Sequence, residues 1–199
     1  MKQCSTMDIE VVLTHLIHVR WVKNLSTSIL AFDIAQFFPS LNHYLLLLIL
    51  EKVSFNSKIL IFFQDYLVGR KTKYLWNSFS SPSFNIDIGV EQGSTLSPIL
   101  SALYLSPIFY INNLKILISI LFFVDDSLFI AQDESLTVSN SYLFYSYHVM
   151  FSLLKQFRLV IEYRKIEVFY FSRLHKLFNP SLLDLTPLGG SFLHSKEMW

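Results

Sequence analysis

The chain has 199 residues, which is enough for one well-buried core and at most two small ones. Hydrophobic residues make up 52% and charged residues 16%, so an intrinsically disordered chain is excluded. The net charge is only +1, so the overall charge gives no reason to propose nucleic-acid binding, and any such claim depends on local motifs.

The apolar composition raises the question of a membrane protein. No apolar run reaches about 18 residues, the length of a spanning helix, so we expect no membrane segment. The first thirty residues carry charges such as Lys2, Asp8 and Arg20 without the apolar core of a secretory signal. The single cysteine, Cys4, excludes an intramolecular disulfide. We therefore expect an intracellular protein; the compartment, the nucleus included, and the oligomeric state stay open.

The first third of the chain is predicted to alternate between helix and strand. Apolar spacings of three and four predict a helix over 8–19. A short buried strand over 28–32 then delivers Asp33 at its end. Two further helices are expected over 42–53 and 59–68, the first of them apolar nearly all round and therefore buried.

The middle of the chain is predicted to contain two strands, 71–76 and 84–88, separated by a Ser/Pro-rich linker over 78–83. A loop over 89–94 follows. The next helix is expected over 97–112, with Pro98 in its first turn and a kink at Pro107.

The last third begins with an apolar hairpin, LFFVDDSLFI, over 121–130. A helix is expected through 137–155, strands over 159–163 and 166–171, and a loop-like chain from 174 onward. This order of elements favours an α+β fold with a ferredoxin-like (split βαβ) antiparallel sheet backed by helices.

Two adjacent carboxylates, Asp125 and Asp126, interrupt the apolar hairpin. Two like charges in an apolar setting are costly unless a cation neutralises them. In the expected topology Asp33 comes from a neighbouring strand, so three carboxylates converge. That is enough oxygen ligation for two Mg²⁺ ions completed by water and substrate phosphates. The alternative is an ordinary Asp-Asp turn between surface strands.

Three segments stand in order along the chain: AFDIAQFFPSLNH at 31–43, GVEQGSTLSPIL at 89–100 and FVDD at 123–126. They resemble motifs A, B and C of the reverse transcriptase palm, specifically that of LINE-type (non-LTR) retrotransposons. RKIEVFYFSR at 164–173 is similar to motif D. The resemblance implies a polymerase palm and an RNA-directed DNA polymerase, whose partners are an RNA template, a DNA primer and deoxynucleotides.

The resemblance also implies a domain plan. Residues 1–27 are expected to be a remnant of the fingers/palm junction, 28–173 the reverse transcriptase palm, and 174–199 a truncated lead-in to the primer-grip region. Fingers and thumb are expected to be missing, so a catalytically inactive retrotransposon remnant is one alternative. Another two-metal nucleotidyl transferase or a nucleotide cyclase is a second alternative.

By position in the motifs, Asp33, Asp125 and Asp126 are implied as the catalytic carboxylates that hold two Mg²⁺ ions, with Mn²⁺ as an alternative metal. The reaction implied is attack of a primer 3′-hydroxyl on a deoxynucleotide triphosphate. Lys165 matches the motif D lysine, which would protonate the departing pyrophosphate; a solvated surface lysine is the alternative.

Three further residues match positions that contact the nucleotide. Phe38 is implied under the sugar, where its ring leaves no room for a 2′-hydroxyl; a core aromatic is the alternative. Gln92 and Gly93 are implied to approach the nucleotide and template. Glu91 departs from the family pattern and would place a negative charge close to this polyanionic substrate. Phosphate contacts are expected mainly from the basic segment 155–176.

Overall fold

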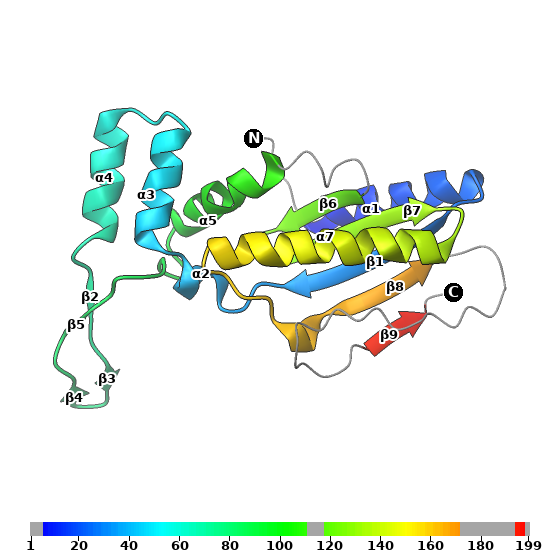
Figure 1. Ribbon diagram of the computed structural model, residues 1–199. Helices are drawn as coiled ribbons and strands as arrows, with labels where there is room; N and C mark the ends of the chain where they lie inside the picture. Colours follow the sequence, from blue (N-terminus) through cyan, green and yellow to red (C-terminus); the bar gives the residue numbers. More distant parts are fainter. Residues whose placement is uncertain (1–5, 111–117, 172–193, 198–199) are drawn as a thin grey trace. The chain divides into compact units, whose positions relative to one another are not determined.

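The computed structural model describes residues 6–110, 118–171 and 194–197. The chain divides into two compact units (Figure 1). The first unit is formed by residues 1–35, 111–154 and 160–199, and the second by residues 36–110 and 155–159. Each unit is therefore assembled from segments that are distant in sequence.

A five-stranded sheet with the strand order β6-β7-β1-β8-β9 forms the centre of the first unit. Its strands are β1 Ser26–Asp33, β6 Ile118–Phe123, β7 Asp126–Asp133, β8 Glu167–Phe171 and β9 His194–Glu197. Neighbours are antiparallel except β8 and β9, which are parallel. The order of β1, β6, β7 and β8 is that of a split βαβ sheet, so the predicted fold class is confirmed.

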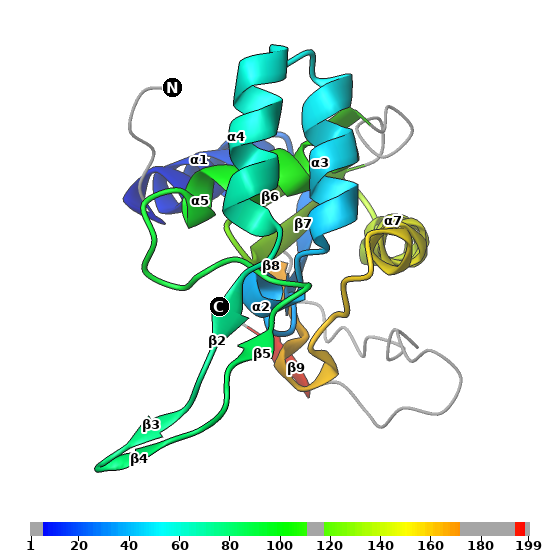
Figure 2. The ribbon, with the colours of Figure 1, turned by 90° about the vertical axis from the view of Figure 1, so that its left-hand side faces the viewer.

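Helices cover both faces of this sheet. On one face Ile17 of α1 (Thr6–Val22) packs against Ile29 and Ile130. On the other face Ser139 of α7 (Leu136–Gln156) shares a hydrogen bond of 2.7 Å with Ser28. Because successive strand residues point to opposite faces, the neighbours Ser28 and Ile29 lead to different helices. Figures 1 and 2 show α1 and α7 on either side of the strands.

The second unit is mainly helical. Its helices are α2 Phe37–Ser40, α3 His43–Lys52, α4 Ser57–Leu67, α5 Ser97–Leu105 and the 3₁₀ helix η1 Ser106–Tyr110. Asn42 and Asn56 cap α3 and α4, since the side chain of each accepts a hydrogen bond of 3.0 Å from a backbone N–H of the first turn. The fully buried Tyr104 donates a hydrogen bond of 2.6 Å to the carbonyl of Phe157, which ties the segment 155–159 to this unit.

Most predicted elements are confirmed, and two predictions in the middle of the chain were wrong. The strand expected over 71–76 is broken into β2 Lys71–Thr72 and β3 Leu75–Trp76, the strand expected over 84–88 is shortened to β5 Phe84–Asn85, and β4 Phe79–Ser80 lies in the segment expected as a linker. The helix expected over 97–112 ends at Leu105 and tightens into η1. Pro107 explains this, because it has no N–H and its ring clashes with the carbonyl four residues earlier.

Two predictions near the end of the chain also differ. The segment 159–163 is not a strand: it forms one bridge, between Ile161 and Ile34, and leads into the 3₁₀ turn η2 (Tyr163–Lys165). Part of the segment expected as loop, β9, pairs with the free edge of β8. The remaining residues after 171 lie outside the described part. None of the helices in that described part is long and apolar enough to cross a membrane.

Candidate active site

Asp33 and Asp126 face one another at the end of the sheet. They form the last residue pair of the antiparallel ladder between β1 and β7. Directly opposed residues of such a ladder point to the same face, which here is the face that α1 covers. Asp33 is buried, with 8% of its surface exposed, and Asp126 is exposed.

Asp125 lies in the two-residue turn between β6 and β7. The turn is tied to the chain after β1 by a hydrogen bond of 3.2 Å from the Ile34 N–H to the Asp125 carbonyl. Val124, the other turn residue, has a φ of 60°. A β-branched residue rarely adopts this left-handed conformation, so the turn is held by the strands on both sides.

Lys165 brings a positive charge to the buried carboxylate. It lies in η2, and its Nζ forms an ion pair with Asp33 Oδ2. This hydrogen bond, followed by the charge of Asp33, raises the pKa of Lys165. The other oxygen, Asp33 Oδ1, is buried and has no hydrogen-bond partner among the described residues. One oxygen of the carboxylate is thus paired with the ammonium, and the other is a buried acceptor without a partner among the described residues.

The electrostatics around Asp126 favour a cation. Loss of solvent raises the pKa of Asp126, and the nearby charges of Asp125 and Asp33 raise it further, while Lys165 lowers it. A raised carboxylate pKa means that the negative form is disfavoured by its surroundings. A bound cation would reverse that effect.

A cavity of about 570 Å³ lies beside these carboxylates, within the first unit. Its lining includes Asp33, Asp126, Lys165, Arg164 and Glu10 of α1. A cavity lined by both signs of charge has groups for phosphate oxygens and groups for cations.

In the described residues, no group of three or more His, Cys, Asp or Glu side chains is arranged to hold a metal ion. The chemistry of the set nevertheless fits a hard divalent cation, because Asp33 Oδ1 is buried without a partner and the Asp126 carboxylate is repelled by two neighbours. The convergence of three carboxylates on metal ions therefore stays a prediction.

The second unit holds the other three residues singled out from the motifs. Phe38 is half-buried in α2, and its carbonyl accepts a hydrogen bond of 2.8 Å from Val90 N, at the start of the loop 89–94. Gln92 and Gly93 are exposed in that loop, and Gly93 has a φ of +91° that favours glycine. The structure thus brings Phe38 to the loop 89–94, and Asp33, Asp125, Asp126 and Lys165 to one end of the sheet.

Arg70 lies beside the loop 89–94, and its role there was not predicted from the sequence. Its guanidinium lies 3.7 Å from Glu91 and stacks 5.7 Å above the ring of Tyr66. The negative charge of Glu91 is therefore countered by a cation 21 residues earlier in the chain. Such a pairing between two loop ends leaves no periodic signal in the sequence, so only a three-dimensional structure could reveal it.

Solved structures with a similar fold include telomerases. The telomerase of Candida tropicalis in complex with a TWJ fragment of telomeric RNA has a TM-score of 0.65 and 16% identity over 84% of this chain. The apo form scores 0.64, with 15% identity over 86% of this chain, and the Candida albicans enzyme with the same RNA fragment scores 0.52, with 16% over 82%. This chain spans 30%, 33% and 31% of their respective lengths. At these identities the likeness shows the fold.

The family is defined by sequence. The model of the reverse transcriptase (RNA-dependent DNA polymerase) family matches residues 1–195. The chain therefore belongs to the reverse transcriptase family, as the motif resemblance implied. None of the curated proteins matches it at a significant level.

Proposed function

We propose that this chain is the palm-bearing part of an RNA-directed DNA polymerase of the LINE (non-LTR) type, which adds deoxynucleotides to a primer 3′-hydroxyl on an RNA template. One observation carries the proposal: Asp33 lies directly opposite Asp126 on neighbouring strands, with Asp125 in the adjoining turn. Membership of the family supports the reaction, and the motif set quoted above supports the LINE type.

In this proposal Asp33, Asp125 and Asp126 hold two Mg²⁺ ions, or Mn²⁺ in their place. Such ions, when bound, lower the pKa of the attacking hydroxyl and neutralise charge on the triphosphate. Phe38 limits the space at the sugar 2′ position. Lys165, whose pKa is raised, carries the proton that the departing pyrophosphate needs.

Residues 28–173 would then be the palm, residues 1–27 would lead in from the fingers, and residues 174–199 would lead to the primer grip. Gln92 and Gly93 contact the nucleotide and template. The exposure of Gln92 and Gly93 supports this role, and a Cβ at Gly93 would meet nothing within 4 Å, so the loop is accessible to a ligand.

Primer extension tests the proposal. The full chain is incubated with an RNA template, a DNA primer, deoxynucleotides and Mg²⁺, and compared with Asp125→Asn and with Asp65→Asn, a matched change of an exposed carboxylate on α4. Loss of one metal ligand should lower the rate at least about 100-fold, while Asp65→Asn keeps the wild-type rate. Equal extension by wild type and Asp125→Asn would refute the proposal.

A second candidate is a chain that keeps the fold without catalysis. The ion pair between Lys165 and Asp33 favours it, because the ammonium already neutralises the buried carboxylate that a metal ion would need. Here the wild-type chain would show no extension beyond that of Asp125→Asn. Mg²⁺ would also leave its thermal unfolding temperature unchanged, which separates this candidate from an active enzyme lacking the right template.

A further inference from the structure

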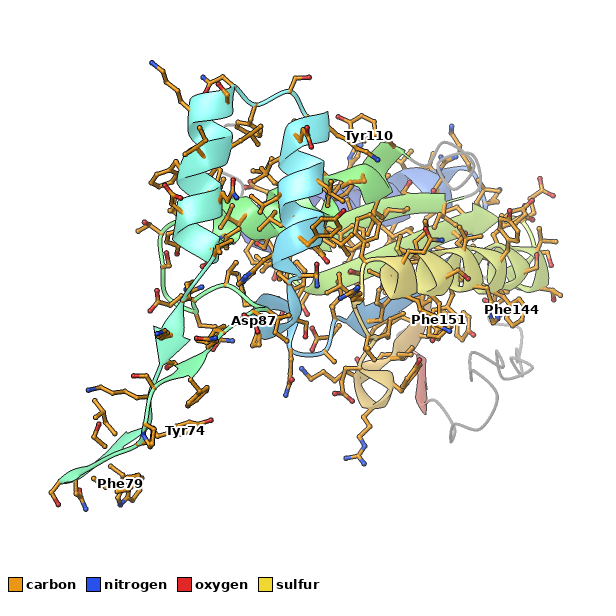
Figure 3. The ribbon with its side chains drawn as sticks, turned by 60° about the vertical axis from the view of Figure 1, so that its left-hand side comes forward. Tyr74, Phe79, Asp87, Tyr110, Phe144 and Phe151 are labelled. Atoms are coloured by element: carbon orange, nitrogen blue, oxygen red, sulfur yellow. The ribbon has the colours of Figure 1, made fainter. Side chains whose placement is uncertain are left out.

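Residues 70–88 form an arm of the second unit in which apolar rings face solvent. Figure 2 shows the strands of the arm running away from α3 and α4. Trp76 is 77% exposed, Tyr74 71%, Phe79 61% and Phe84 41%. Figure 3 shows Tyr74 and Phe79 on the arm, away from the helices. Exposed apolar rings gathered on one element are typical of a binding surface.

The rings share one face of the arm. Trp76 is the register partner of Phe79, and Ser81 N donates a hydrogen bond of 2.9 Å to the Tyr74 carbonyl, which sets Tyr74 opposite Ser81. Residues two apart on a strand point to the same side, so Tyr74 follows Trp76 along that face. The Phe84 ring lies 5.3 Å from the Tyr74 ring and continues the row.

The arm is positively charged. Among residues 70–88 there are three cations, Arg70, Lys71 and Lys73, and one acid, Asp87. Arg70 is engaged by Glu91, whereas the exposed Lys71 and Lys73 make no ion pair within the described residues. Two lysines thus stand beside the row of rings with their charges available to an anionic ligand.

This combination fits single-stranded nucleic acid better than a protein partner. Bases stack on exposed aromatic faces, and lysines beside them contact the phosphates. Between the rings the arm carries mostly Ser and Asn, such as Asn77, Ser78 and Ser80, where a protein interface would place a continuous apolar core.

We propose that residues 70–88 bind a single-stranded segment of nucleic acid, with bases stacked on Tyr74, Trp76, Phe79 and Phe84 and phosphates held by Lys71 and Lys73. That this strand is the RNA template rests on the proposed function. The binding itself rests on the exposure, the register and the charge of the arm.

Binding of the full chain to a short fluorescein-labelled RNA strand, measured by anisotropy without divalent ions or deoxynucleotides, tests the proposal. Trp76→Ala should weaken binding about 5- to 140-fold, the effect of losing one stacked base. Leu75→Ala is the matched control, because Leu75 is 67% exposed on the same strand but pairs with Ser80 on the opposite face. It should bind as the wild type does.

The lysines are tested by salt dependence. The double variant Lys71→Ala, Lys73→Ala should reduce the slope of log affinity against log salt by about 0.7 for each phosphate that a lysine no longer neutralises. A DNA strand of the same sequence and an RNA duplex are measured in parallel. Stacking predicts that both single strands bind and that the duplex, whose bases are already stacked, binds more weakly.

Equal affinity of wild type, Trp76→Ala and Leu75→Ala would overturn the proposal and leave an acidic protein partner as the occupant of the arm. If the chain extends primers but Trp76→Ala does not weaken its affinity for RNA, strand binding by the arm is refuted and the proposed function stands. If Trp76→Ala weakens RNA binding but the chain extends no primer, strand binding by the arm stands and the proposed function is refuted. Thermal unfolding of each variant checks that it is folded. We expect each to fold because the substituted side chains are exposed.

Discussion

Asp33 and Asp126 are partners in one ladder, yet only the first is buried. Both lie on interior strands of the sheet, but the carbonyl of Asp33 also accepts a hydrogen bond of 2.9 Å from the Glu162 N–H, which brings the segment with Lys165 to Asp33, whereas Asp126 begins β7 directly after a turn. Burial of an unpaired carboxylate is costly, and Lys165 supplies the compensating charge. The sequence predicted which carboxylates matter, but the partner of Asp33, 132 residues away, follows from no local pattern.

The raised pKa of Asp126 predicts a dependence of stability on pH in the absence of divalent ions. In the unfolded state the pKa of Asp126 is near 3.8, and in the folded state Asp126 holds its proton more tightly. The free energy of unfolding should therefore fall as pH rises above 3.8 and through the raised pKa. Asp126→Asn should remove this loss and be more stable at neutral pH. The gain should stay below about 1 kcal/mol, because Asp126 is exposed and solvent screens its charge.

Urea unfolding of wild type and Asp126→Asn at several pH values, with a chelator present, measures the effect. Asp65→Asn on α4 is the control for a change in net charge. An advantage of Asp126→Asn that is largest at acid pH and shrinks toward neutrality would contradict the expected sign.

At the scale of elements, the β6 to β7 turn stores strain at Val124. Val124 is the first residue of a two-residue hairpin turn and alone in that turn has a positive φ, a position that favours Gly and costs an ordinary residue about 1–2 kcal/mol. Val124→Gly should therefore stabilise the chain by up to about 1 kcal/mol in urea unfolding. Val124→Ala keeps the left-handed penalty and should give no such gain; equal effects of the two substitutions would show that the turn is not strained.

The loop after the arm depends on a close approach at Gly89. A Cβ at this position would lie 2.6 Å from the Pro39 carbonyl oxygen, and its φ is +84°. Gly89→Ala should destabilise the chain by about 1–3 kcal/mol in urea unfolding. Gly69→Ala is a matched control: its φ is +71°, but a Cβ there meets nothing within 4 Å, so it should cost clearly less. Equal costs would mean that the approach to Pro39 is unimportant.

Elements were predictable where the local pattern is strong. The strand that ends at Asp33 is a buried run, the hairpin around Asp125 consists of apolar runs on both sides of a turn, and α3 and α4 begin at Asn side chains that cap them. Prediction failed at 159–163, where an apolar run forms one bridge and then a 3₁₀ turn. There the pairing partner, not the local sequence, decides whether a strand forms.

At the scale of the whole molecule, the two units should respond differently to Mg²⁺. If the carboxylates bind the metal, ten times its dissociation constant should stabilise the occupied site by about 1.4 kcal/mol. Hydrogen exchange at the end of β1 and in the turn 124–125 should slow about 10-fold, while α3 and α4 of the second unit should be unchanged. Uniform protection of both units, or the same protection in Asp125→Asn, would contradict a site confined to these carboxylates.

The sequence by itself determined the family, the α+β class and the order of the motifs, because each depends on residues within one short segment. Only the tertiary structure decided that Asp33 faces Asp126, that Lys165 neutralises Asp33, that Arg70 offsets Glu91, and that the rings of the arm share an exposed face. Strand register and ion pairs join segments far apart in the chain, and their free energy comes from burial and pairing that no local periodicity encodes.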